Sequence, residues 1–151
     1  MANLTIISNI GPVSKLLAER LQVLSNPEYL LRPIAFDVID LMTKRIHIDG
    51  KDSSNGQIGT YSSGYMRERA RNNRKEGTKV IVSLTRQLEN DWSVIATPKG
   101  YGVGFKNIFN AKKMRWVEGT YDKEIASLAP EELQHVSEMV TELVQKALSG
   151  K

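Results

Sequence analysis

Cysteine is absent from the 151 residues of this sequence. The absence excludes a disulfide framework, a thiol nucleophile and a thiolate metal site. No apolar run approaches the ~18–20 residues that span a bilayer. The N-terminal stretch MANLTIISNIG also lacks the basic and apolar regions of a signal peptide. We therefore expect synthesis in a cytoplasm and no membrane partner.

Histidine is scarce as well, and no set of catalytic groups comes together in the sequence. His47 and His135 are the two histidines. His47 lies two residues before Asp49, but no third ligand follows at a metal-binding spacing. The glycines of 100–104 fall within an expected hairpin and lack the spacing of a nucleotide-binding loop. We expect no enzymatic activity, no metal and no cofactor.

The composition is that of an ordinary folded domain, with 40% hydrophobic and 25% charged residues. Its length favours a single domain over residues 1–151. The net charge is +4, and the window 67–75 contains five basic residues and one acidic residue. That window alone carries the equivalent of the whole net charge, so an anionic partner should meet the protein there.

The hydrophobic pattern predicts helices toward both ends of the chain and a small antiparallel sheet between them. Leu16, Leu17, Leu21 and Leu24 predict one helix, the apolar stripe 30–42 a second, and Pro130 followed by two glutamates a C-terminal one. Strands are expected at 4–8, 79–84, 92–97 and 101–105, the last two as a hairpin, with a short helix over 107–117 that Gly119 ends. This order predicts an α+β fold whose C-terminal helix packs on the sheet.

A long polar segment, residues 48–78, separates the predicted helices from the sheet, and we name it the basic arm. Its first part, 48–63, has three glycines and four serines, which is loop chemistry. Ser62 or Ser63 is expected to cap a short helix that carries the basic window. Three interpretations of this window stay open: a protein interface, a solvated charged face, or a nucleic-acid site.

The tyrosines and tryptophans leave similar alternatives. In a nucleic-acid site, Tyr61 and Tyr65 would stack on bases while the nearby arginines pair with phosphates. Trp92 and Trp116 are each expected in the core. The alternative for either tryptophan is an anchor for a neighbouring subunit, because tryptophan is enriched at the centres of interfaces.

The order of these features resembles the tail-completion and virion-morphogenesis proteins of tailed bacteriophages. The resemblance covers about residues 30–148. It rests on the tyrosine pair 61 and 65, the basic window, the segment Val80–Thr85 with Leu88 beyond it, the hairpin Val94–Phe105, a short helix with Ala111, Trp116 and Gly119, and the helix from Pro130. The sequence departs from the family at Arg86, where those proteins often have glycine.

The resemblance implies an α+β structural subunit, without a cofactor, in a six- or twelve-fold ring at the neck or upper tail of the virion. Other neck and tail proteins would be its partners, and packaged DNA a non-specific contact. The expected interface or DNA-facing residues are Tyr61, Tyr65, Arg67, Arg69, Arg71, Arg74, Lys75 and Arg86. The alternative function is a small basic nucleic-acid-binding module that uses the arginine cluster.

Overall fold

The computed structural model describes residues 19, 25, 27–74, 77–98 and 100–150 of the chain. The strand expected at 4–8 and the four leucines of the first expected helix lie outside these residues. Within them, no helix combines the length and the apolar character needed to cross a membrane.

A long helix, α2 (Pro27–Thr43), forms the centre of the fold and continues as the π-helical turn η1 (Lys44–Ile48). Ile34, Val38, Met42 and Ile46 recur every four residues and are all almost fully buried. This spacing places them on one face of the helix. Ile34, Val38 and Met42 of the predicted stripe 30–42 therefore form the core face of α2, whereas Leu41 of the same stripe is exposed.

The predicted hairpin is confirmed. Strands β1 (Trp92–Thr97) and β2 (Gly100–Phe105) form a two-stranded antiparallel sheet in which Trp92 pairs with Phe105. The rings of that pair lie 4.1 Å apart between centroids. Since a lone hairpin is marginally stable in water, its stability depends on α2, which contacts both strands.

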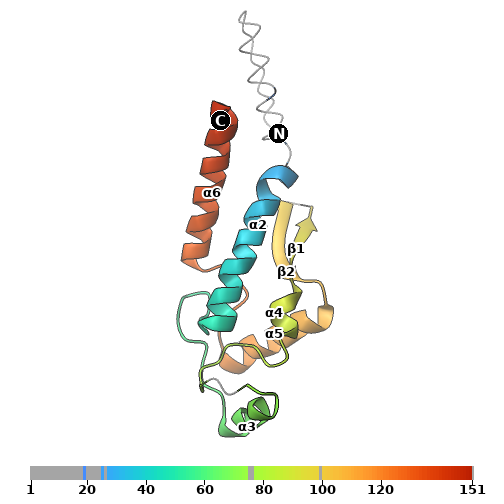
Figure 1. The fold of residues 1–151 in the computed structure, drawn as a ribbon, viewed down its shortest axis with the longest axis vertical. Coiled ribbons are helices and arrows are strands. Elements are labelled where there is room, and N and C mark those ends of the chain that lie inside the picture. Colours follow the sequence, from blue (N-terminus) through green and yellow to red (C-terminus); the bar gives the residue numbers. More distant parts are fainter. Residues whose placement is uncertain (1–18, 20–24, 26, 75–76, 99, 151) are drawn as a thin grey trace, which may run out of the picture.

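The C-terminal helix, α6 (Pro130–Ser149), begins at the predicted proline. It packs against α2, and α2 stands between α6 and the hairpin (Figure 1). The mixed α+β fold with a C-terminal helix is thus confirmed, and the closest partner of that helix is α2.

A buried ion pair joins the first turn of α6 to η1. Arg45 Nε donates to Glu132 Oε1 at 2.7 Å, and both side chains are about 5% exposed. The same guanidinium donates to the carbonyl oxygens of Lys51, Ile125 and Ser127. Glu132 in turn accepts the N–H of Ala129 at 2.8 Å. The sequence pattern gave no indication of this pair.

Three further helices of the described residues lie toward the end of the molecule that is opposite the C-terminus (Figure 1): α3 (Ser63–Arg71), α4 (Gln87–Asp91) and α5 (Ile108–Tyr121). The expected cap of α3 is confirmed, because Ser62 Oγ accepts the N–H of Tyr65 at 3.2 Å. Helix α5 runs through Gly119, so the prediction that this glycine ends the helix is wrong. The helix stops where Asp122 turns to φ +51°.

The strand predicted over residues 79–84 is also wrong. The segment forms a single bridge, between Lys79 and Thr60, and no ladder. Val80 and Val82 are buried, which produced the strand-like pattern. However, Val82 has φ +47°, a conformation that is rare for a β-branched residue and interrupts an extended path.

Removing one partner of the buried pair should destabilise the fold strongly. We expect Glu132→Ala to lower the free energy of unfolding by about 3 kcal/mol, because it leaves the Arg45 charge buried without its carboxylate. Urea denaturation followed by circular dichroism measures this change. Glu142→Ala is the matched control: Glu142 pairs with Lys146 on the exposed side of α6, and its loss should hardly move the midpoint. Equal midpoints for the two variants would contradict the role of the pair.

Candidate interaction site

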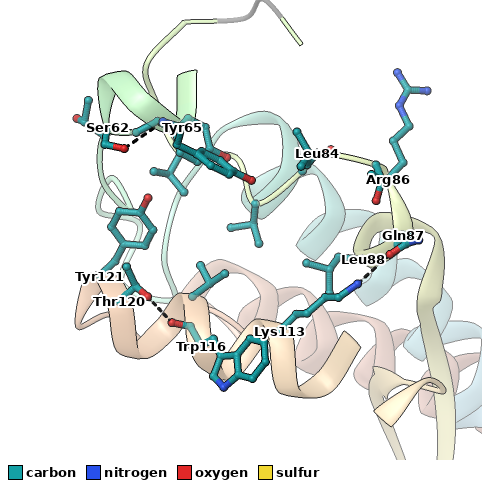
Figure 2. A pocket seen from close by; sticks show the side chains of 17 residues that line it. Ser62, Tyr65, Leu84, Arg86, Gln87, Leu88, Lys113, Trp116, Thr120 and Tyr121 are labelled. Carbon is teal, nitrogen blue, oxygen red and sulfur yellow. Dashed lines mark hydrogen bonds between the residues drawn. The ribbon is translucent and has the colours of Figure 1, made fainter. Parts of the chain in front are cut away.

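An apolar groove of about 730 Å³ lies between the start of α3, residues 80–88 and α5 (Figure 2). Its apolar lining includes Tyr65, Val82, Leu84, Leu88, Trp116 and Val117. Trp116 is 71% exposed and Tyr65 is 39% exposed. An exposed indole at the edge of an apolar groove is typical of a binding surface rather than of a core. The expectation that Trp116 lies in the core is therefore wrong.

One wall of the groove is held in place by a fully buried arginine. Arg69, on α3, has no exposed surface, and its guanidinium lies 4.4 Å from the centroid of the Tyr61 ring. It donates to the Tyr61 hydroxyl at 3.2 Å and to the carbonyl oxygen of Ser83. Since a buried charge is costly unless it is well bonded, these contacts tie α3 firmly to the segment 80–86.

Tyr61 is the centre of this network. Its hydroxyl also accepts the N–H of Ile81 at 3.1 Å, and its ring lies 5.1 Å from that of Tyr65. Burial raises the pKa of the Tyr61 phenol, so the hydroxyl stays protonated at neutral pH. Both tyrosines of the pair identified from the sequence line the groove, but Tyr61 is buried and supports it, whereas Tyr65 is exposed.

A second arginine fixes the same stretch of main chain. Arg74 Nη2 donates to Ser83 Oγ at 2.6 Å, and Nε donates to the carbonyl oxygen of Leu84 at 3.1 Å. Its guanidinium also lies 3.7 Å from Glu89. Side chains thus occupy main-chain groups that a neighbouring strand would otherwise bond, which gives a physical reason why no sheet forms here.

The basic cluster is therefore divided by the fold. Arg67 and Arg71 are exposed on α3, and Arg71 pairs with Glu68 at 3.2 Å. Arg69 and Arg74 bond within the chain, and Lys75 lies outside the described residues. Arg69 is fully buried, so its assignment as an interface or DNA-facing residue is wrong in this conformation. The sequence could not reveal this division, because nothing in the local sequence distinguishes an arginine that will be buried from one that will be exposed.

Arg86 lies at the edge of the groove, immediately before α4, and is exposed. Its backbone has φ +62° and ψ 7°, in the left-handed region that favours glycine. The backbone thus follows the path that a glycine would take, and the arginine is accommodated there with strain.

His47 bonds the main chain at Ile81, between two residues that line the groove. It is buried, and its Nε2 accepts the indole N–H of Trp92 at 2.9 Å. The other nitrogen, Nδ1, then carries the proton and donates to the carbonyl oxygen of Ile81 at 3.3 Å. Both ring nitrogens are occupied, which leaves neither for a metal ion. Over the described ranges, no three histidine, aspartate or glutamate side chains are grouped to bind one.

The groove itself was not predicted, although several of its residues carried a signal. Leu84 was expected at the end of a strand, Leu88 belonged to the resemblance, and Val117 was expected at the end of a short helix; all three line the groove. They come together only because the segment 80–88 and α5 fold against one another. The exposure of Trp116 was one of two alternatives in the sequence, and the structure decides between them.

A scan against protein-family models, a search of characterised proteins and a search of solved structures each found no match to the chain.

The burial of His47 predicts a pH-dependent stability. Burial lowers the pKa of His47 below its usual value of 6.5, with a smaller opposing effect of Glu89. Below pH 6.5 the His47 imidazole takes up a proton more readily in the unfolded chain than in the folded chain. The free energy of unfolding therefore falls as the pH falls. We expect this contribution to approach about 1.4 kcal/mol per pH unit.

Urea denaturation at several pH values between 7.5 and 5 tests this prediction. His47→Gln should show a shallower fall in stability than the unaltered protein, whereas the control His135→Gln should keep the steeper fall. Equal slopes for the unaltered protein and His47→Gln would refute it.

The left-handed backbone of Arg86 predicts that glycine stabilises this position. Arg86→Gly should raise the free energy of unfolding by about 0.5–1 kcal/mol, because relief of the left-handed strain exceeds the greater entropy that glycine loses. Arg67→Gly, in the middle of α3, is the matched control and should lower it by about 1 kcal/mol. Thermal unfolding distinguishes the two signs, and a loss at both positions would contradict the assignment.

Proposed function

We propose that this chain is a structural virion protein of a tailed bacteriophage that assembles into a ring at the neck or upper tail. In that position it would serve in tail completion or in joining head to tail. The observation that carries the proposal is the solvent-open apolar groove with Trp116 and Tyr65 exposed along it. Exposed aromatic side chains at a groove are what a stable subunit contact buries.

The turn at Arg86 adds support from a different direction. The phage proteins that the sequence resembles often have glycine at this position, and the backbone here adopts the conformation that favours glycine. The departure in residue type therefore preserves the local backbone path that glycine would take. The support comes from the backbone conformation at position 86, which the residue type alone does not reveal.

Two exposed arginines fit a subunit whose ring surrounds DNA. Arg67 and Arg71 lie exposed on one helix, and neither guanidinium is needed for the internal network around Tyr61. Cations of this kind bind phosphates without reading the base sequence. We propose that they supply a non-specific contact with packaged DNA, secondary to assembly.

The alternative, a nucleic-acid-binding module, is less well supported. Of the five cations that suggested it, Arg69 is fully buried and Arg74 is bonded to Ser83, Leu84 and Glu89. The charge available to a phosphate backbone is smaller than the sequence indicates, which lowers the expected affinity.

Native mass spectrometry and negative-stain microscopy of the purified protein test the proposal. We expect rings of six or twelve copies, and the protein itself in purified virions of the phage that encodes it. Trp116→Ala should weaken assembly at least tenfold, because it removes the largest exposed side chain of the groove. Phe109→Ala is the matched control: Phe109 is 66% exposed on the same helix but does not line the groove.

A strict monomer that is also absent from virions would refute the proposed function. Rings that form equally well with Trp116→Ala would instead show that assembly uses a different surface.

A further inference from the structure

Helix α5 presents to solvent a face that combines aromatic, aliphatic and basic side chains. Ile108, Phe109 and Trp116 are 64%, 66% and 71% exposed, among the highest exposed fractions of any large apolar side chain in the described residues. Lys112 and Arg115 of the same helix are exposed as well. At 3.6 residues per turn, these five residues fall within about one third of the circumference of the helix. We call them the outer face of α5.

The outer face is positively charged. Lys112 and Arg115 lie on it and Lys113 lies beside it, whereas Glu118 is the one acidic residue within α5. The carboxylate of Glu118 accepts two main-chain N–H groups of the linker that follows, at 2.8 and 2.9 Å, so it is bonded within the chain. Asp122 lies beyond the last turn of the helix. The charge of this face therefore favours an anionic partner.

The cations of the outer face are interleaved with its apolar side chains. Lys112 falls in the middle of the face, between Phe109 and Trp116 on one side and Ile108 on the other. Its Nζ lies 5.8 Å from the centroid of the Phe109 ring, within the range of a cation–π contact. A helix that lies on a bilayer keeps its charges on the opposite side from its apolar face, and the core of a protein interface is depleted of charge. The interleaved pattern therefore fits neither of these partners.

A single-stranded nucleic acid offers both kinds of group that such a face binds. Its phosphates pair with lysine and arginine, and its bases stack on aromatic rings whatever the base sequence. Phe109 and Trp116 are seven residues apart, which separates them by about 10.5 Å along the helix axis. This distance is about three steps of a stacked strand, at ~3.4 Å for each step. The two rings can thus meet different bases of one strand.

We infer that the outer face of α5 binds single-stranded nucleic acid without reading its sequence. Phe109 and Trp116 stack on bases, and Lys112 and Arg115 pair with the phosphates between them. The site is separate from the basic window 67–75. Of its residues, Trp116 alone also lines the groove, so the binding goes beyond the proposed assembly function.

Fluorescence anisotropy with a labelled oligothymidylate at low salt tests this inference. A length of about 16 nucleotides covers the site size of a small single-strand-binding domain. Phe109→Ala should weaken binding by roughly fivefold or more, because it removes one of the two stacking rings. Phe36→Ala is the matched control: Phe36 is 52% exposed on α2, outside the outer face of α5, and its loss should leave the affinity unchanged.

The salt dependence of the same binding measures the phosphate contacts. Lys112→Ala with Arg115→Ala should lower the slope of log affinity against log salt by about 1.4, since each phosphate contact on a single strand contributes about 0.7. Lys44→Ala with Lys146→Ala removes the same charge from two exposed positions on η1 and α6, and should leave the slope unchanged.

Tryptophan fluorescence reports whether a base stacks on the outer face. Trp116 is 71% exposed and Trp92 is 7% exposed, so a bound strand should quench the emission of Trp116 and leave that of Trp92. Trp116→Phe keeps an aromatic ring at this position. This variant should retain most of the affinity for the oligothymidylate and lose the quenching.

Three results would overturn the inference. One is the absence of binding at low salt. The second is equal affinity for a duplex of the same length with no effect of Phe109→Ala, which would show a contact through phosphates alone. The third is binding to phosphatidylserine vesicles but not to the oligothymidylate. None of them bears on the ring, because Phe109→Ala, Lys112→Ala and Arg115→Ala lie outside the groove and should leave assembly intact.

Discussion

The buried ion pair of Arg45 and Glu132 holds together two parts of the chain that are far apart in the sequence. The two residues are 87 positions apart, and the same guanidinium bonds carbonyl oxygens on both sides of the gap. It thereby fixes the polar loop after η1, the linker before α6 and the first turn of α6 against one another. A buried charge tolerates little displacement, because every lost contact leaves desolvation uncompensated. The position of α6 beside α2, and hence the surface that α6 exposes, follows from this constraint.

At the opposite end of the molecule, the buried Arg69 likewise holds separate parts of the chain together. Arg69 and Tyr61 hold α3 to the segment 80–86, and Arg74 bonds Ser83 and Leu84 of that segment. Together they let the segment follow an irregular path with Val82 and Arg86 at positive φ. That path, rather than a strand, opens the groove in front of Trp116. Strain of this kind persists only where surrounding contacts determine the backbone, and it is concentrated at functional sites.

The same residue type therefore has two physical roles within nine positions of sequence. Arg67 and Arg71 meet solvent, whereas Arg69 is enclosed by an aromatic ring and main-chain oxygens. The charge of the window is real, but its availability depends on which side of a short helix each residue occupies and on what packs there. For this reason we propose the apolar groove, rather than the basic cluster, as the main surface for a partner.

The sequence by itself determined the elements whose signals are local. The four-residue spacing of α2, the proline and glutamates that open α6, the Ser62 cap and the paired strands of the hairpin are each set by neighbours within a few positions. Tertiary structure alone decided that residues 79–84 form no strand, that Arg69 is buried, that Arg45 pairs with Glu132 and that Trp116 is exposed. Those outcomes depend on contacts between residues far apart in the chain, and periodicity carries no information about which distant group will meet a given side chain.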